Sequence, residues 1–327
     1  MAIHNLEFKV KHTEPVRLDQ LIAEEISTFF LQRYPEASIT KSKIRRLIIA
    51  GSVSMNGQQE RQPARKIPAS SVIRIRLDTD RFLFEKQPDD ITFELTSKDV
   101  LYEDTWILIV NKPARFPAEG TIVGGRDNLH EACKRYLNQS GEHRNTPYCG
   151  LLHRLDRETS GVMLFSKTRT VNAAIQEQFS RKTIQKTYLA LAAPAPGVSA
   201  PDSSFSAQNR LARISPKSTR GKWGAVPTGG DEAHTDFELF RQKKGMLIFR
   251  AFPRTGRTHQ IRVHLSGLGF PILGDTLYGG VKEFHGKTVP RIMLHALELR
   301  MTHPAKGTPL VVSVEPPDDF QQFWEHQ

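Results

Sequence analysis

The chain has 327 residues, with 46 Lys and Arg against 35 Asp and Glu, so its formal net charge is +11. This length indicates two domains, or one large domain with an appendage. A hydrophobic share of 38% permits a sizeable core and argues against wholesale disorder. So large a positive surplus favours a polyanionic partner, nucleic acid before an anionic membrane surface.

Several protein classes are excluded early. No run approaches the ~20 apolar residues of a membrane-spanning helix, and the first residues are polar and charged where a signal peptide needs an apolar core. Cys133 and Cys149 form neither a C-x-x-C nor a finger arrangement, so we expect two reduced thiols rather than a disulfide framework or a zinc site. These features predict a cytoplasmic protein that does not associate with membranes.

Residues 1–80 have the pattern of a small, basic folded unit. Apolar residues recur at helical spacing between residues 18 and 30. Thr40 is placed to cap a second helix that Gly51 ends, and Asn56-Gly57 is a hairpin turn signal before a closing strand at residues 72–77. The charge on the second helix is of one sign, and its four basic residues are expected to contact RNA phosphates: Lys41, Lys43, Arg45 and Arg46.

This order of helix, helix and hairpin comes with a set of spaced residues: Arg17-Leu18-Asp19, Ser42, Ile44, Ile48, Gly51, Val53, Met55, Asn56 and Gly57. Together they resemble the alpha-L RNA-binding module (the S-four domain) over about residues 15–77. The resemblance implies phosphate contacts that do not read sequence. The alternative is a charged helix face that is only solvated. We place a linker at residues 81–90 and a second domain at residues 91–327.

The second domain is rich in predicted strands and poor in regular alternation with helices. It is therefore expected to be α+β, with a mixed, mostly antiparallel sheet flanked by helices and loops. Residues 194–230 are rich in Pro, Ser, Gly and Lys and are predicted to form an irregular insertion. The patterns predict strands at 91–95, 106–110, 162–165, 188–192, 237–240, 246–252 and 310–314, and helices at 129–137 and 171–179.

The most informative segment is His153-Arg154-Leu155-Asp156-Arg157-Glu158-Thr159-Ser160-Gly161, directly before an apolar strand. Two arginines flank Asp156, and nearby positive charge favours the ionised carboxylate. An ionised, partly desolvated carboxylate can act as a nucleophile or a general base. From charge alone, a surface ion pair with Arg154 or Arg157 is the simpler interpretation.

The whole segment is similar to the signature His-Arg-Leu-Asp-x-x-Thr-Ser-Gly of RluA-type pseudouridine synthases and matches it at each fixed position. The resemblance covers about residues 91–316, and an alpha-L module is a common companion of this family. Further segments continue the resemblance: Asn111-Lys112-Pro113, Lys186-x-Tyr188, residues 255–265, Gly274-Asp275-x-x-Tyr278-Gly279 and Leu294-His295-Ala296.

The resemblance implies an enzyme that isomerises uridine to pseudouridine in RNA. Large-subunit ribosomal RNA is the expected substrate, and transfer RNA is the alternative. The reaction transfers nothing to a third molecule, so no cofactor and no metal is expected. The target base has to leave its stack, so the site needs a basic channel and an apolar or aromatic pocket.

The same resemblance assigns roles to individual residues. Asp156 would be the catalytic nucleophile, Arg262 would pair with it and keep it charged, and Tyr188 would pack against the uracil. The remaining residues are expected to bind substrate: Arg154, Leu155, Thr159, Arg257 and His259.

The segment around Arg262 fits a helix better than a strand, with Thr258 as its cap and Gly269 as its stop. Two other functions stay open at this stage. One is an RNA-binding or ribosome-associated protein without catalysis, against which the intact Asp156, Tyr188 and Arg262 argue. The other is a metal-dependent nuclease or phosphatase, which would need a carboxylate cluster that the sequence does not present.

Overall fold

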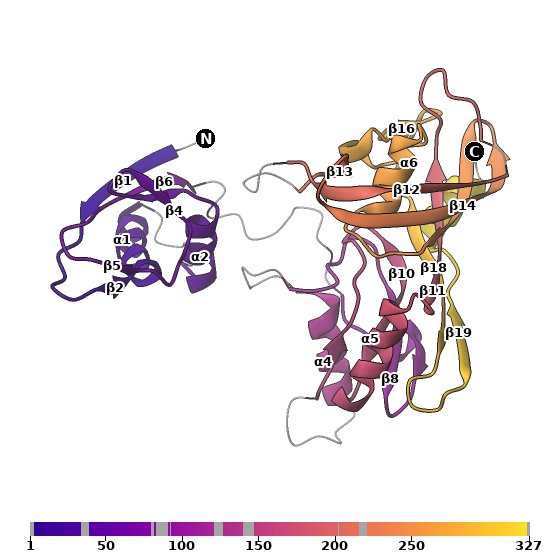
Figure 1. The fold of residues 1–327 in the computed structure, drawn as a ribbon, viewed down its shortest axis with the longest axis horizontal. Helices are drawn as coiled ribbons and strands as arrows, with labels where there is room; N and C mark the ends of the chain where they lie inside the picture. The colour runs from indigo at the N-terminus through magenta and orange to yellow at the C-terminus, as the bar shows by residue number, and fades with distance from the viewer. Residues whose placement is uncertain are drawn as a thin grey trace. The chain divides into compact units, whose positions relative to one another are not determined.

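The computed structural model describes residues 3–33, 39–79, 82, 91, 93–120, 127–139, 147–201, 203–215 and 221–325. The chain divides into two compact units, residues 1–90 and almost all the described residues from 91 onward, and each is described by itself (Figure 1). Apart from residue 82, the expected linker at 81–90 lies outside the described residues. In the described part of the chain, no helix is long and apolar enough to span a bilayer.

The N-terminal unit packs two helices on a small antiparallel sheet whose strand order is β1-β6-β3-β4. The apolar series between residues 18 and 30 lies on the buried side of the first helix, as its spacing predicts. The elements are β1 (Ile3–Lys9), β2 (Val16–Arg17), α1 (Leu18–Arg33), α2 (Lys41–Ile49), β3 (Val53–Met55), β4 (Gln58–Glu60), β5 (Lys66–Ile67) and β6 (Val72–Asp78).

The predicted signals at the ends of these elements are confirmed. The Thr40 hydroxyl accepts a hydrogen bond from the Lys43 backbone N–H at 3.3 Å, which caps α2. Gly51 follows the helix with φ 81°, and Asn56 and Gly57 turn β3 into β4 with φ 48° and 84°. Positive φ at both turn residues is what an Asn-Gly hairpin provides.

The second unit is built on an eleven-stranded sheet with the order β13-β12-β14-β15-β11-β18-β10-β8-β7, to which β19 adds beside β18 and β9 beside β10. Within this described sheet only β10 and β18 run parallel, so the predicted mixed, mostly antiparallel α+β fold is confirmed. Its strands are β7 (Val100–Glu103), β8 (Ile107–Lys112), β9 (Gly150–Leu151), β10 (Ser160–Ser166), β11 (Gln185–Ala192), β12 (Ser204–Arg213), β13 (Trp223–Val226), β14 (Asp231–Lys243), β15 (Met246–Pro253), β18 (Leu294–Thr302) and β19 (Pro309–Ser313).

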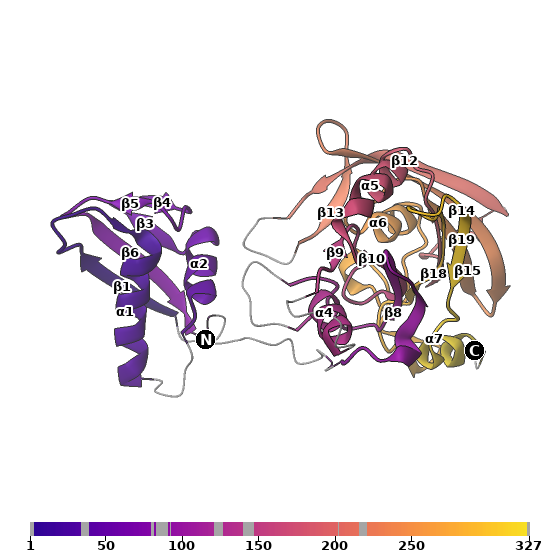
Figure 2. The same cartoon turned by 90° about the horizontal axis from the view of Figure 1, so that it is seen from below.

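Helices and short elements complete this unit. Helix α6 contacts β13, β14 and β15, and Figure 2 shows it inside the curve that the strands from β12 to β15 describe. The remaining elements are η1 (Ser97–Asp99), α4 (Leu129–Gln139), η2 (Arg169–Val171), α5 (Asn172–Ser180), α6 (Gln260–Gly267), η3 (Thr276–Tyr278), β16 (Glu283–Phe284), β17 (Lys287–Thr288) and α7 (Asp318–Glu325).

The central strands are buried on both faces, which explains their uninterrupted apolar runs. In β8, Leu108 belongs to one hydrophobic cluster and Ile109 to another on the opposite face. In β10, Met163 and Leu164 divide in the same way. The middle of the sheet is therefore fixed from two sides, and the segments that leave these strands begin from well-packed positions.

Two predictions about this unit are wrong. The described part of residues 194–230 is not a wholly irregular insertion, because it contains β12 and β13, which extend the large sheet. Residues 91 and 93–95 form no strand, and the edge of the sheet begins instead at β7. In both places the local composition misleads: Pro and Ser flank strands at 204–226, and alternating apolar residues at 91–95 pack without pairing.

Candidate active site

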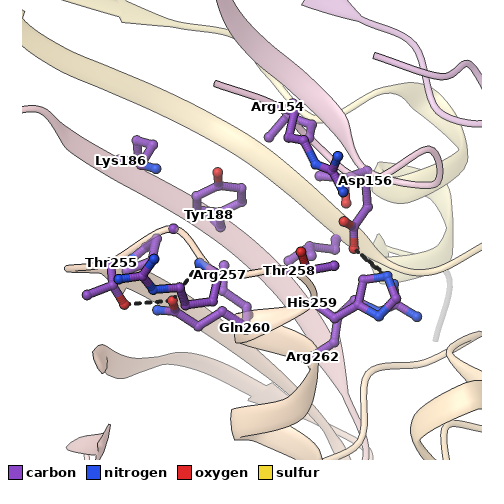
Figure 3. Close-up of a pocket in the computed structure, with 16 residues that line it drawn as sticks. Arg154, Asp156, Lys186, Tyr188, Thr255, Arg257, Thr258, His259, Gln260 and Arg262 are labelled. Atoms are coloured by element: carbon purple, nitrogen blue, oxygen red, sulfur yellow. Dashed lines mark hydrogen bonds and ion pairs between the residues drawn. The ribbon is translucent and has the colours of Figure 1, made fainter. Parts of the chain in front are cut away.

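A cavity of about 160 Å³ lies in the second unit, and three segments of the chain form most of its lining, which Leu294 of β18 completes. The HRLD segment, the start of β11 and the loop before α6 meet there (Figure 3). All eight site residues predicted for this unit line the cavity: Arg154, Leu155, Asp156, Thr159, Tyr188, Arg257, His259 and Arg262.

The loop that carries Asp156 is fixed from below by a buried lysine. Lys112, at the end of β8, donates from Nζ to the carbonyl oxygens of Pro113, Phe116 and Arg157 at 2.8, 2.7 and 3.0 Å. Burial lowers the pKa of Lys112 to about 7. Since Arg157 directly follows Asp156, the lysine ties this loop to the rigid centre of the sheet.

Asp156 faces an arginine that is shared between two carboxylates. Arg262 Nη1 donates to Asp156 Oδ2 at 2.9 Å, and its Nε and Nη2 donate to the two oxygens of Asp275 at 2.6 and 2.9 Å. The side chains of Arg262 and Asp275 are 3% and 1% exposed, whereas that of Asp156 is 23% exposed. Asp275 thus holds the guanidinium in the interior, and Asp156 is the carboxylate that opens into the cavity.

The electrostatics keep Asp156 ionised. Burial alone would raise the pKa of its carboxyl, but the charges of His259 and Arg262 and the hydrogen bond from Arg262 outweigh burial and bring the pKa below the usual value. The pKa of the Tyr188 phenol changes in the opposite direction: burial raises it, and the negative charge of Asp156 raises it further. At neutral pH the cavity therefore presents a carboxylate beside a protonated tyrosine.

His259 lies between the same carboxylate and Tyr278. The Tyr278 hydroxyl oxygen accepts from the Trp223 backbone N–H at 2.9 Å and lies 2.8 Å from His259 Nδ1. The other ring nitrogen of His259, Nε2, lies 3.8 Å from Asp156 Oδ2. The Arg262 guanidinium carbon is 4.9 Å from the centre of the Tyr278 ring.

The loop before α6 is held in shape by Gln260. Its side-chain oxygen accepts from the Thr255 hydroxyl and the Arg257 backbone N–H, and its amide nitrogen donates to β14. Arg262 lies in the first turn of α6, as predicted, but the predicted cap Thr258 is wrong. His259 occupies that position in the left-handed region with φ 57°, and it makes no side-chain cap bond.

The fold and this geometry can be compared with known proteins. A family described as RNA pseudouridylate synthase matches residues 106–267. An uncharacterised RNA pseudouridine synthase of Aquifex aeolicus is 30% identical to the chain, over 98% of the chain and 96% of that protein. The chain belongs to the RNA pseudouridine synthase family. It is therefore an enzyme, an isomerase that acts on RNA.

Other members agree with this assignment. Ribosomal large subunit pseudouridine synthase D of Zymomonas mobilis is 31% identical to this pseudouridine synthase, over 93% of the chain and 95% of that protein. The structure of human RNA pseudouridylate synthase domain containing 4 superposes with a TM-score of 0.55 at 25% identity, covering 69% of this chain and 91% of the human one. The second unit has this family's kind of fold, a mixed sheet with flanking helices.

The predicted RNA contacts of the synthase's N-terminal unit require one correction. Lys41 and Arg45 are exposed on α2 and Arg46 is half-buried, but Lys43 is buried at 3% exposure. The expected exposed position of Lys43 is therefore wrong. Lys43 lies one turn before the buried Leu47, on the side of the helix turned toward the interior, whereas Arg46 is only half-buried.

Four residues in or beside the cavity received no role from the sequence: Lys186, Gln260, Asp275 and Tyr278. Each stands in a quoted motif, but a motif does not say what a side chain touches. A physical signal existed for Asp275, because a guanidinium has five N–H donors and a single partner carboxylate cannot satisfy a buried one. Neither Lys186 nor Tyr278 carries a comparable signal in the sequence.

Proposed function

We propose that this synthase isomerises a specific uridine in large-subunit ribosomal RNA and that Asp156 is its nucleophile. One observation carries the proposal: an ionised carboxylate, anchored by a buried arginine, opens into a cavity beside a buried tyrosine. Relatives named as ribosomal large subunit pseudouridine synthases, aligned over more than nine-tenths of the chain, support the ribosomal substrate.

The proposed chemistry needs only the groups that line the cavity. The bond between uracil N1 and the ribose C1′ breaks, the uracil turns, and C5 bonds to C1′; the proton lost from C5 is balanced by the one gained at N1. Asp156 attacks the nucleotide as the ionised carboxylate that Arg262 maintains, and the bond that it forms breaks again before the product leaves, so that the carboxylate is regenerated. Tyr188, 8% exposed and protonated, packs against the extruded base from the wall of the cavity.

The decisive test is a map of pseudouridines in ribosomal and transfer RNA from cells with and without the gene. We expect one or a few uridines of large-subunit ribosomal RNA to remain unmodified when the gene is absent, and the purified protein to modify the same positions in a transcript. Loss of a transfer-RNA position instead would overturn the ribosomal assignment. An unchanged map, together with an inactive purified protein, would contradict catalysis altogether.

We further propose that the N-terminal unit binds RNA through the exposed face of α2, in the manner of an alpha-L module. Replacing Lys41 and Arg45 together by Ala should weaken binding of the target transcript about tenfold at low salt and reduce the salt slope by about 2, because two phosphate contacts are lost. The turnover rate at saturating RNA should stay within about twofold. Titrations at several salt concentrations measure both quantities.

A matched control exists in the same unit. Lys9 and Lys11 are exposed but lie outside α2, so their double Ala variant removes the same charge from another surface. We expect it to change affinity and salt slope much less. If the two double variants weaken binding equally, α2 is not a specific contact and the unit contributes only net charge.

A further inference from the structure

The end of the cavity away from Asp156 holds two cations without a carboxylate partner. Figure 3 shows the side chains of Lys186 and Arg257 on the side of Tyr188 opposite to Asp156. Among the described residues, no hydrogen bond or ion pair reaches the Lys186 ammonium, whose Nζ lies 5.6 Å from the centre of the Phe179 ring. The guanidinium of Arg257 donates through Nε to the backbone carbonyl of Glu232 at 3.0 Å, an uncharged acceptor.

Other lysines of this unit do have acceptors, and the buried Lys112 donates to three carbonyl oxygens. Lys134, Lys167 and Lys306 each pair with a carboxylate, at 2.9, 2.7 and 2.8 Å. A largely buried ammonium without a counter-charge is costly, since it has lost water and gained no partner. Burial is the cause that lowers the pKa of Lys186 to about 8. A cation retained at such a cost on the wall of a cavity indicates a ligand that supplies the missing negative charge.

The two cations belong to one surface of the cavity. A Cβ built on Gly256 would lie 3.8 Å from Lys186 Nζ, so the ammonium sits directly over the loop that carries Arg257. Gln260 fixes that loop, and β11 fixes Lys186. Two positive groups on rigid elements, with Asp156 at the opposite end, give the cavity a charge separation along its length.

The RNA backbone supplies anions, its phosphodiesters, at a position that matches these two cations. An extruded uridine that reaches Asp156 brings its own flanking phosphodiesters to the mouth of the cavity, because they are covalently attached to it. Asp156 repels these groups, whereas Lys186 and Arg257 attract them. On the basis of the proposed function, we propose that Lys186 and Arg257 form a subsite for a phosphodiester adjacent to the target uridine, which orients the nucleotide with its base toward Tyr188.

The surroundings extend this subsite in one direction. A second hollow of about 230 Å³ shares Lys186 and Pro253 with the cavity. Its lining includes Lys182, Arg254 and Arg300, of which Arg254 pairs with Asp236 at 2.7 Å and Arg300 with Glu298 at 2.6 Å. Under the same proposal, the strand beside the bound phosphodiester runs over this hollow.

The first test compares Lys186→Met with Lys186→Arg on a short RNA fragment that carries the mapped uridine. The Met variant keeps the length of the side chain but not its charge, so we expect KM to rise about tenfold, kcat to change less than about threefold, and the salt slope of binding to fall by about 1. The Arg variant should recover most of the affinity. Lys134→Met, which removes a charged lysine of α4 outside the cavity, should behave as the parent protein.

The second test identifies the phosphate. Single phosphodiesters of the fragment are replaced in turn by uncharged methylphosphonates. In the parent protein one position beside the target uridine should weaken binding about tenfold, and in Lys186→Met the same replacement should cause a loss of about threefold or less, because only Arg257 still faces the phosphate. Arg257→Gln should show the same coupling, which keeps the test valid if the Met variant does not fold.

The two proposals fail in different ways. Parental affinity and salt slope in Lys186→Met, or losses that add at every phosphate position, would overturn the subsite while the parent protein still forms pseudouridine. A parent protein that forms none in the fragment would instead contradict the proposed function.

Discussion

Replacing Asp156 by Asn is expected to reduce pseudouridine formation by at least about 10⁴-fold while the affinity for RNA stays within a few-fold of the parental value. The side-chain shape and the acceptor oxygen for Arg262 are both retained in the variant, so the 2.9 Å contact to the guanidinium can persist. What disappears is the negative charge and with it the nucleophile. Single-turnover assays and binding titrations on the same transcript separate the two effects.

The control for this variant is an aspartate of the same unit that does not line the cavity. Asp127 pairs with Arg135 on the surface, and Asp127→Asn should leave turnover unchanged. Because the pKa of Asp156 lies below the ordinary carboxyl value, Asp156 stays ionised above that lowered pKa, and the pH–rate profile should show no acid limb from this group between about pH 5 and 8. Turnover at the parental rate in Asp156→Asn would exclude the proposed nucleophile.

Much of the secondary structure could be predicted from local patterns in the sequence. The capping Thr40, the Asn56-Gly57 turn and the helical spacing of α1 each depend on residues within one turn or one helix face, and each is found as predicted. The apolar run of β10 is similarly self-contained, because a strand buried on both faces needs no partner to be recognised. These features are decided by short-range physics that a single sequence displays.

Features that depend on distant partners were missed. Strand β1 alternates between half-buried and exposed residues, and only its pairing with β6, more than sixty residues away, gives it a place. Strand β12 is largely polar and β13 has only four residues, and the two belong to the sheet only through their pairing with β14 and with each other. Lys43 shows the same limit, because helix spacing cannot say which charged side turns inward.

In the candidate site too, the sequence predicted the residues, and only the structure showed their contacts. Asp156, Tyr188 and Arg262 were assigned roles from a resemblance, and the structure brings all three to one cavity. The sequence could not show that Arg262 is shared with Asp275, since thirteen residues and a change of element separate the two. Nor could it show that His259 adopts a left-handed conformation, which non-glycine residues rarely take.

The shared arginine leads to the second large expected effect. Replacing Asp275 by Asn removes one of two carboxylates from a guanidinium that is 3% exposed, and it turns an amide N–H₂ toward existing donors. We expect the free energy of unfolding to fall by about 3 kcal/mol, as when a buried pair loses a partner. We also expect kcat to fall about 10–100-fold, because Arg262 is no longer held where it aims at Asp156. Thermal or denaturant unfolding and single-turnover rates measure the two losses.

A second arginine–aspartate pair in the same unit separates positioning from stability. Arg291 is buried and donates to both oxygens of Asp319 at 2.7 and 3.0 Å, yet neither residue lines the cavity. Asp319→Asn should therefore lower stability in the same direction without changing kcat. If both variants lose turnover in proportion to their lost stability, Asp275 acts only on the fold. If only Asp275→Asn loses turnover, at a temperature well below its unfolding midpoint, Asp275 is a positioning residue that aims Arg262 at Asp156.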